Sequence, residues 1–340
     1  MEDVNYSRNG ILGGKEMKVV DMHCDTISHI ASAAKKGEAP ISLRENTLHL
    51  DLKKMKEGDY LLQNFAMFVS LKHHEKPLEW CQYLIDTYYE EIKKNEDLIA
   101  PVFSYEDICN NKKAGKMSAL LTIEEGGVTK GELANLRNFY RLGVRMITLT
   151  WNYKNEIGFP NRDASNPPRD DRMPNTKDGL TAFGKEFVEE MEALHMIPDV
   201  SHLSDAGFYD VAAVAKKPFV ASHSNARAIW PHTRNLTDDM IRTLSEHGGV
   251  MGINYEPSFL GDEEDKLSVI VNHIRHIADV GGINCIGLGS DFDGIDTNES
   301  LKDGSYLPRL EDALYKAGFG CEEIAAIFYK NVLRVYKEVL

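Results

Sequence analysis

Short apolar runs alternate with longer amphipathic segments along most of the chain. The apolar runs predict eight strands, at Lys18–His23, Tyr60–Ser70, Met117–Glu124, Arg145–Thr150, Met196–Ser201, Pro218–Ser222, Val250–Asn254 and Cys285–Ser290. The amphipathic segments predict eight helices, at Glu79–Lys94, Gly131–Leu142, Thr181–His195, Asp205–Ala215, Thr237–Glu246, Lys266–Val280, Leu307–Ala317 and Cys321–Val339. Strands that alternate with helices indicate a parallel sheet. Eight of them in one uninterrupted series favour an α/β fold of the closed (β/α)8, TIM-like barrel type.

No internal repeat or low-complexity linker divides the chain. The stretch that comes nearest to a boundary runs over about 152–178, where Pro160, Pro167, Pro168 and Pro174 lie among polar residues. Loops of this length inside a compact domain are usually functional or disordered. Because the same alternation resumes after it, we expect one barrel domain over residues 1–340, with a loop excursion at about 152–178.

Composition and charge narrow the class of protein. The 340 residues are 42% hydrophobic and 27% charged, with a formal net charge of −14. This acidic balance argues against nucleic acid or an anionic membrane as a partner. The first residues are polar, no apolar run reaches the roughly 20 residues that span a bilayer, and the five cysteines are scattered without metal-binding spacing. We therefore expect a cytoplasmic protein with reduced thiols.

Polar residues close several of the predicted strands, where the active sites of such barrels lie. His23 and Asp25 are two residues apart, so on an extended chain they point to the same side and can share a cation. The alternative for this pair is a capping aspartate beside a hydrogen-bonded histidine. After the third predicted strand, one carboxylate of Glu124-Glu125 must face the barrel mouth while the other turns away. We place Glu125 at the mouth, although a solvated acidic turn is the alternative for this residue alone.

Two strands end in the same dipeptide. Ser201-His202 and Ser222-His223 lie 21 residues apart, about one strand–helix unit, so their imidazoles should sit on adjacent strand ends. With His23, Asp25 and Glu125 on the same rim, the set lacks thiolates and suits zinc or a similar divalent ion.

Further candidate residues follow the last predicted strand or lie on a predicted helix. Asp291 closes the last predicted strand, where a carboxylate can act as general base and then general acid. Asp293 is better explained as a turn residue before Gly294. His273 and His276 are three residues apart on a predicted helix, and we expect a solvated helix face there.

Six separated motifs together resemble the renal (membrane) dipeptidase family, metallopeptidases of the M19 type with an amidohydrolase-like barrel. They are His23-x-Asp25, Glu125-Gly126-Gly127, Ser201-His202, Ser222-His223-Ser224, Arg234-Asn235 and Gly289-Ser290-Asp291-Phe292-Asp293-Gly294. Their order and spacing match the family from about Val19 to the C-terminal helix, which is nearly the whole chain.

The resemblance implies two Zn²⁺ ions per chain. One ion would be held by His23 and Asp25 and the other by His202 and His223, with Glu125 bridging both. Four positive charges close together need a shared carboxylate and lower the pKa of a bridging water toward neutrality.

The resemblance also assigns roles around the ions. Asp291 would handle protons and the substrate amino group, and Arg234 would pair with the substrate carboxylate through its bidentate fork. Trp151 stands where the family commonly has a histidine that stabilises the oxyanion, so its indole, the Asn152 amide or the second zinc ion would take over. We add Tyr255 to Trp151, Asn152 and Arg234 as candidate substrate-binding residues.

The activity implied is hydrolysis of dipeptides through a metal-bridging hydroxide. One alternative is a related metal-dependent amidohydrolase that acts on N-acyl amino acids or β-lactam-like amides. The other is a non-catalytic binding protein on the same barrel, for which the Trp151 departure is the only support. The expected partners are a small dipeptide substrate and, from the resemblance, a second copy in a homodimer; no nucleic acid or membrane is expected.

Overall fold

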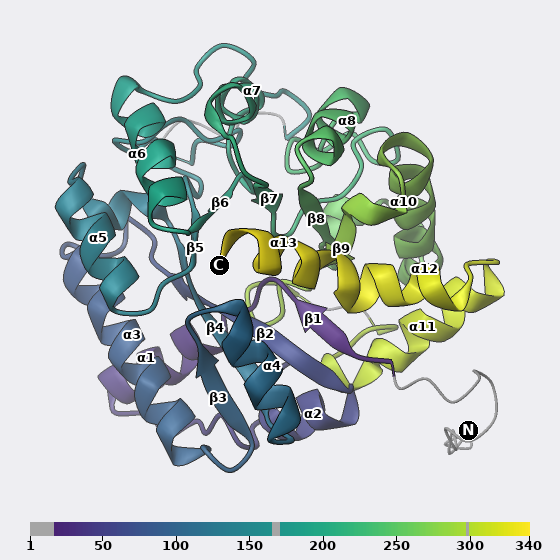
Figure 1. Cartoon of the computed structure of the whole chain (residues 1–340), viewed down its shortest axis with the longest axis horizontal. Coiled ribbons are helices and arrows are strands. Elements are labelled where there is room, and N and C mark those ends of the chain that lie inside the picture. The colour runs from purple at the N-terminus through teal and green to yellow at the C-terminus, as the bar shows by residue number, and fades with distance from the viewer. Residues whose placement is uncertain (1–16, 165–170, 297–298) are drawn as a thin grey trace.

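The computed structural model describes residues 17–164, 171–296 and 299–340, in which nine strands form one parallel sheet (Figure 1). The strand order is β2-β1-β9-β8-β7-β6-β5-β4-β3, and additional pairing between β2 and β4 closes the sheet. The strands are β1 Val19–Asp21, β2 Tyr60–Phe68, β3 Ile99–Val102, β4 Met117–Glu124, β5 Met146–Thr148, β6 Ile197–Asp199, β7 Val220–Ala221, β8 Val250–Ile253 and β9 Ile286–Leu288. All eight predicted strands are present, and the predicted closed (β/α)8 barrel is confirmed.

The ninth strand, β3, lies outside the ring of eight. One edge of β4 pairs with β2, from Ser118 to Glu124. The other edge is divided, because β3 pairs with Met117–Leu120 and β5 pairs with Thr122–Glu124. The sequence did not predict β3 because its four residues include Pro101, which cannot donate a ladder hydrogen bond and is typical of edge strands.

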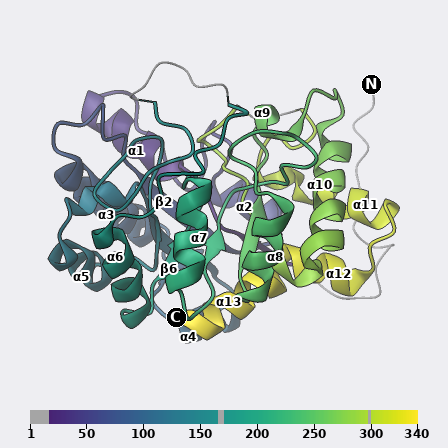
Figure 2. The same ribbon diagram turned by 90° about the horizontal axis from the view of Figure 1, so that it is seen from above.

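Helices surround the sheet on its outer side and close one end of the barrel (Figures 1 and 2). They are α1 Thr26–Lys36, α2 Leu52–Glu57, α3 Pro77–Lys94, α4 Tyr105–Lys113, α5 Leu133–Arg141, α6 Ala182–Ala193, α7 Asp205–Val214, α8 Asp238–Glu246, α9 Pro257–Leu260, α10 Lys266–Gly281, α11 Leu307–Lys316, α12 Cys321–Ala325 and α13 Asn331–Val339. The eight predicted helices are found within a few residues of their expected bounds. The last is interrupted by a π-helical turn at Ala326–Lys330, and the sequence did not predict α1, α2, α4 and α9.

The C-terminal helix closes one end of the barrel. Its Val332, Val335, Tyr336 and Val339 pack with an apolar cluster inside the ring, made of Val20, Met22, Leu62, Leu120, Met146, Ile197, Val220 and Val250 among others. Most of these positions lie near the starts of their strands, and Figure 1 shows α13 across the centre of the ring. Figure 2 places α9, which follows β8, at the opposite end from α13. The carboxyl ends of the strands therefore stay available for a site.

The predicted excursion falls between β5 and α6, and its residues 165–170 lie outside the described residues. Asn161 ties the part that precedes this gap to the barrel, because its backbone N–H donates to the His202 carbonyl at 2.9 Å and its amide donates to Asp205 Oδ1 at 2.8 Å. The Asn175 N–H, after the gap, donates to Asn161 Oδ1 at 2.8 Å. The described parts of the excursion thus lie beside the strand end that carries His202. Among the described residues, no helix combines the length and apolar character needed to cross a bilayer.

Truncating a side chain inside the ring should destabilise the fold. Ile197 is fully buried in the cluster beneath α13, so Ile197→Ala should lower the free energy of unfolding by about 2–5 kcal/mol. Ile229 is 37% exposed, and Ile229→Ala should change it by less than about 0.5 kcal/mol. Urea titration of both metal-free variants measures the difference. Equal losses would contradict the assignment of Ile197 to the packed interior.

Candidate metal centre

Six polar side chains meet at the carboxyl ends of five barrel strands. His23 and Asp25 follow β1, Glu124 ends β4, and the other three, His202, His223 and Asp291, follow β6, β7 and β9. All six are buried, from 1% exposed at His23 and His223 to 9% at His202. The ligand atoms of His23, Glu124 and His223 lie within 4.8 Å of one another, as do those of His23, Asp25 and Asp291. The structure therefore brings together five of the residues that the sequence singled out. The sixth is Glu124, in the place predicted for Glu125.

Glu124 lies at the centre of this group. Its Oε2 is 3.3 Å from His23 Nε2, while its Oε1 is 3.1 Å from His202 Nε2 and 3.5 Å from His223 Nε2. On the other side, His23 Nε2 is 3.5 Å from Asp25 Oδ2 and 3.7 Å from Asp291 Oδ1. One oxygen of Glu124 thus faces the His23–Asp25 side and the other faces the two remaining imidazoles.

The sequence-based placement of Glu125 at the mouth was wrong, and Glu124 occupies that position. Side chains alternate along β4, so Glu124 points to the same side as Leu120, which packs inside the barrel. Glu125 leaves the strand with φ of 110° and turns its carboxylate toward Gly127, Trp151 and Asn155. Alternation along the predicted strand was the signal that could have identified Glu124, but the sequence did not show which alternate residues face inward.

The residues present fit divalent metal ions. Within the described chain, His23 Nε2, Asp25 Oδ1 and Glu124 Oε1 are buried without a hydrogen-bond partner. Burying polar atoms without partners costs free energy, as does burying Asp25, Glu124 and Asp291 next to one another. Cations between these atoms would give the unpartnered atoms a partner and would neutralise the adjacent carboxylates. A set of imidazoles and carboxylates suits zinc.

A buried aspartate supports the ligands on each side of Glu124. Asp199 accepts hydrogen bonds from the backbone N–H groups of Ser201 and Ser222 at 3.0 and 2.8 Å, and from the hydroxyls of Ser222 and Thr148 at 2.5 and 2.6 Å. Asp21 accepts from the hydroxyl and N–H of Ser290 at 2.5 and 2.9 Å. These contacts cross between neighbouring strands and hold the strand ends in register. The sequence analysis missed both aspartates, although each lies two or three residues before a predicted histidine ligand.

The outer ring nitrogens of two histidines also have partners. His202 Nδ1 is 3.0 Å from Asn152 Oδ1, an acceptor, so this nitrogen carries the proton and Nε2 is left as a ligand atom. His223 Nδ1 is 2.7 Å from the Ser222 hydroxyl, which itself donates to Asp199. Both Nε2 atoms accordingly face Glu124.

The burial and close approach of these titratable side chains shift their pKa values. Burial raises the pKa of Asp291 to about 8, with the nearby Asp25 and Glu124 carboxylates adding to the effect and His23 opposing it. Burial lowers the pKa of His202 to about 3, aided by the Arg234 guanidinium. Burial alone would raise the pKa of Glu124, but His23 and the other imidazoles hold it well below its usual range. The centre is thus poised to exchange protons for metal cations.

The predicted substrate-binding residues lie in different places. Arg234 is buried beside the centre, where its Nη2 donates to the His223 carbonyl at 3.1 Å and its guanidinium lies over the Phe259 ring. Its Nε has no hydrogen-bond partner among the described residues. Tyr255 follows β8 and is fully buried, with its ring against Phe292 and its hydroxyl without a hydrogen-bond partner among the described residues.

Trp151 and Asn152 follow β5 next to His202. The indole of Trp151 is partly buried, with its ring centroid 4.8 Å from that of Phe68 and 6.1 Å from that of His202. Asn152 directs its amide oxygen to His202 Nδ1, as described above. Trp151 therefore forms part of an aromatic wall beside the centre, while Asn152 supports a ligand.

Two sets of contacts hold the loop after β9, one at Asp291 and one at Asp293. Asn254 Nδ2 donates to Asp291 Oδ2 at 2.9 Å, a contact that the sequence did not predict. Asp293 is a turn residue as expected, with φ of 68°. It also accepts from the Thr26 hydroxyl and the His49 N–H, both at 2.6 Å, which ties the Asp291 turn to α1 and to the loop before α2.

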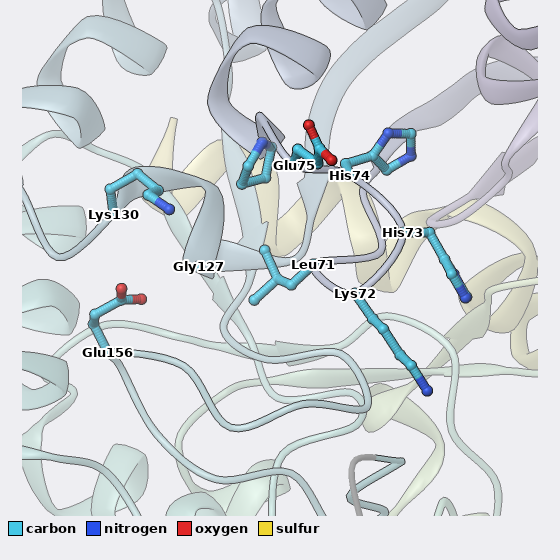
Figure 3. Close-up of a pocket in the computed structure, with 9 residues that line it drawn as sticks. Leu71, Lys72, His73, His74, Glu75, Gly127, Lys130 and Glu156 are labelled. Atoms are coloured by element: carbon cyan, nitrogen blue, oxygen red, sulfur yellow. The ribbon is translucent and has the colours of Figure 1, made fainter.

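A pocket of about 610 Å³ lies near the centre but is not lined by any of the predicted ligands. Its lining comes from the β2–α3 loop and from Gly127, Lys130 and Glu156 (Figure 3). Gly127 stands in the wall between Leu71 and Lys130, and its N–H donates to Glu125 Oε1 at 2.8 Å. The pocket therefore borders the supports of the centre and not the cluster of ligand atoms.

The chain is similar to several known proteins. The family model described as membrane dipeptidase (peptidase family M19) matches residues 14–340. An uncharacterized protein in the pqqA 5′ region of Klebsiella pneumoniae is 39% identical over 222 residues, which cover 64% of this chain and 80% of that protein. An uncharacterized dipeptidase of Schizosaccharomyces pombe is 31% identical over 352 residues, which cover 95% of this chain and 81% of that protein.

A solved structure extends the similarity to three dimensions. A metallopeptidase from Rhodobacter sphaeroides, crystallised with a phosphinate mimic of the dipeptide L-Ala-D-Ala, superposes with a TM-score of 0.87 at 26% identity. The match covers 96% of this chain and all of that one. The barrel thus has a counterpart in a metallopeptidase solved with a dipeptide mimic.

Of the two histidines predicted to lie on a solvated helix face, His273 differs from that expectation. His273 is fully buried, where its Nδ1 accepts from the Ala226 N–H at 3.2 Å and its Nε2 donates to the Leu260 carbonyl at 2.9 Å. His276 is partly exposed and contacts Asp238 at 2.7 Å. His273 is therefore a structural residue that holds the loop after β7 and α9 against α10.

The pKa of His273 gives a test of this role. Burial lowers it to about 4, so the neutral ring contributes stability at pH above 6.5, and this contribution is lost as the pH falls toward 4. In a spectrum of ¹⁵N-histidine-labelled protein, the signal that His273→Gln removes should keep its neutral-ring position from pH 8 down to pH 5.5. Titration of that signal with a midpoint near 6.5 would contradict the buried, neutral role.

Proposed function

Because the chain belongs to the membrane dipeptidase family, peptidase family M19, we propose that it is a zinc-dependent enzyme that hydrolyses dipeptides at the Glu124 centre. One observation supports this most directly, namely that three imidazoles meet at Glu124, with Asp25 and Asp291 beside one of them, at the carboxyl end of the barrel. A binding protein that had lost catalysis would have no need to keep such an arrangement of buried charges.

Two zinc ions per chain would share Glu124. His23 and Asp25 would hold one ion, and His202 and His223 would hold the other. Bound zinc supplies an acidified water for attack and polarises the scissile carbonyl. The chain itself supplies the geometry, because Asp199 and Asn152 fix the imidazoles that must present Nε2.

Asp291 and Arg234 would bind the two charged ends of the substrate. Asp291 lies 3.7 Å from His23 and is oriented by Asn254, so it can accept a proton from the attacking water and deliver it to the leaving amine. Its negative charge also suits a free substrate ammonium group. The buried Arg234, with Nε lacking a partner within the described chain, suits the substrate carboxylate.

Trp151 stands beside His202 and would face the reacting carbonyl. Its indole N–H is a neutral donor, and in this chain it would take the place of the histidine expected from the family resemblance. The Asn152 amide oxygen is engaged by His202, so Asn152 could take this role only through its NH₂ group. The cytoplasmic location and the homodimer stay predictions from the sequence.

The activity can be tested with a panel of substrates on zinc-reconstituted protein. We expect hydrolysis of L-Ala-L-Ala and L-Ala-D-Ala, and little hydrolysis of their N-acetylated or C-amidated forms, because Asp291 and Arg234 each lose a charged partner. Asp291→Asn should keep its zinc but lose about 10²- to 10⁴-fold in kcat, since an amide cannot accept the proton. Cleavage of only the N-acetylated compounds or of β-lactam-like amides would favour the amidohydrolase alternative. No turnover of any compound by zinc-loaded protein would favour a binding role.

The metal content can be tested by changing Glu124. Glu124→Gln replaces the shared carboxylate by a neutral amide, so it should weaken both ions by more than about 100-fold, beyond the usual effect of an outer partner. Glu132→Gln makes the same chemical change at an exposed residue and should have no effect. Elemental analysis after dialysis against a weak chelator gives the zinc content. Two ions retained by Glu124→Gln, or one ion at most in the unchanged chain, would rule out the shared-carboxylate centre.

A further inference from the structure

Glu125 is a fully buried carboxylate that contacts none of the candidate ligand atoms. Its Oε1 accepts from the Gly127 N–H at 2.8 Å and from Asn155 Nδ2 at 2.5 Å, and its Oε2 accepts from the Trp151 N–H at 3.0 Å. Its φ of 110° is a conformation that residues with a side chain rarely adopt. A strained backbone and a buried charge in one residue both cost free energy, and such costs are typical of functional sites.

We propose that Glu125 is a positioning residue that sets the metal affinity of the His202–His223 side of the centre. It would do so by fastening residues 151–155, the loop after β5, to the end of β4. This inference rests on the proposed metal centre, and it assigns to Glu125 a role different from that of a ligand.

The contacts form a short path from Glu125 to His202. The Oε2 of Glu125 fixes the backbone of Trp151, and the next residue, Asn152, holds His202 Nδ1 through its amide oxygen. At the other end of the loop, Asn155 donates both to Glu125 and to the Leu149 carbonyl, and its own oxygen accepts from two following N–H groups. Asn152 is thus held between two anchored positions.

The two glycines after Glu125 allow the loops to approach closely. A Cβ on Gly126 would lie 2.9 Å from the Leu149 carbonyl oxygen and 2.7 Å from Ile157 Cδ1. A Cβ on Gly127 would lie 2.9 Å from Asn155 Cβ and 3.0 Å from Glu125 Oε1. The β4 and β5 loops are therefore packed against each other without room for side chains, and Glu125 supplies the polar contacts in that interface.

The contacts require a carboxylate and not merely a polar side chain of the same size. Three N–H donors point at the two oxygens of Glu125, and a carboxylate offers only acceptors. Glutamine offers one oxygen and one NH₂ group. Either Trp151 or the pair of Gly127 and Asn155 would then face a donor, and one anchor of the loop would be lost.

The experiment compares metal affinity in Glu125→Gln, in Asn152→Ala and in the unchanged full-length protein. Zinc affinities are measured by competition with a chelator, and the cobalt-substituted forms give visible spectra that report ligand geometry. In both variants we expect one of the two ions to bind about 10- to 100-fold more weakly, with an altered cobalt spectrum, and the other ion to be little changed. Glu156→Gln, at an exposed residue of the same region (Figure 3), is the matched control and should behave like the unchanged protein.

The outcomes separate positioning from general stability and from the proposed function. Thermal unfolding of the metal-free variants measures stability independently of the ions. If Glu125→Gln is less stable but binds both ions with unchanged affinity, Glu125 is only structural and the inference is overturned. If Glu125→Gln does not fold, Asn152→Ala decides, because Asn152 is partly exposed, and unchanged affinity in that variant also overturns the inference. If the unchanged protein binds no ion, the proposed function fails instead.

Discussion

The structure depends on the burial of three carboxylates around one imidazole, that of His23. Asp25, Glu124 and Asp291 approach the same imidazole at 3.5, 3.3 and 3.7 Å, in a region largely removed from water. Without cations, such an arrangement opposes folding, because each buried charge gives up its hydration. The barrel can hold it because each side chain comes from the end of a different strand or the turn after it, and ladder hydrogen bonds fix those strands. Metal binding would then repay the cost and stabilise the folded state.

Backbone strain concentrates at the same strand ends. Non-glycine residues with positive φ include Glu125, His202, Asp291 and Asp293, which all lie at the carboxyl end of the barrel. Each is held by hydrogen bonds from a neighbouring segment, as Asp293 is by Thr26 and His49. Strained conformations persist where the surroundings determine them from several directions. In this protein the surroundings are the loops that also orient the candidate ligands.

The sequence predicted what depends on periodicity and missed what depends on packing. Eight strands, eight helices and the strand-end histidines follow from apolar runs and from the residues that close them. The choice between Glu124 and Glu125 does not, because adjacent residues share every local property and differ only in which face of β4 is turned inward. For the same reason His273 could not be distinguished from His276, since only the contacts with Ala226 and Leu260 show which of the two is buried.

Asp21 and Asp199 show how closely the fold and the centre are joined. Each is buried, each accepts from a serine on the neighbouring strand, and each lies just before a histidine of the centre. The same hydrogen bonds that keep neighbouring strands in register at the mouth therefore aim the imidazoles. A change that loosened the barrel at these positions would also misplace ligand atoms, and the affinity for metal depends on their placement within a few tenths of an ångström. Selection for metal binding would accordingly act on barrel closure itself.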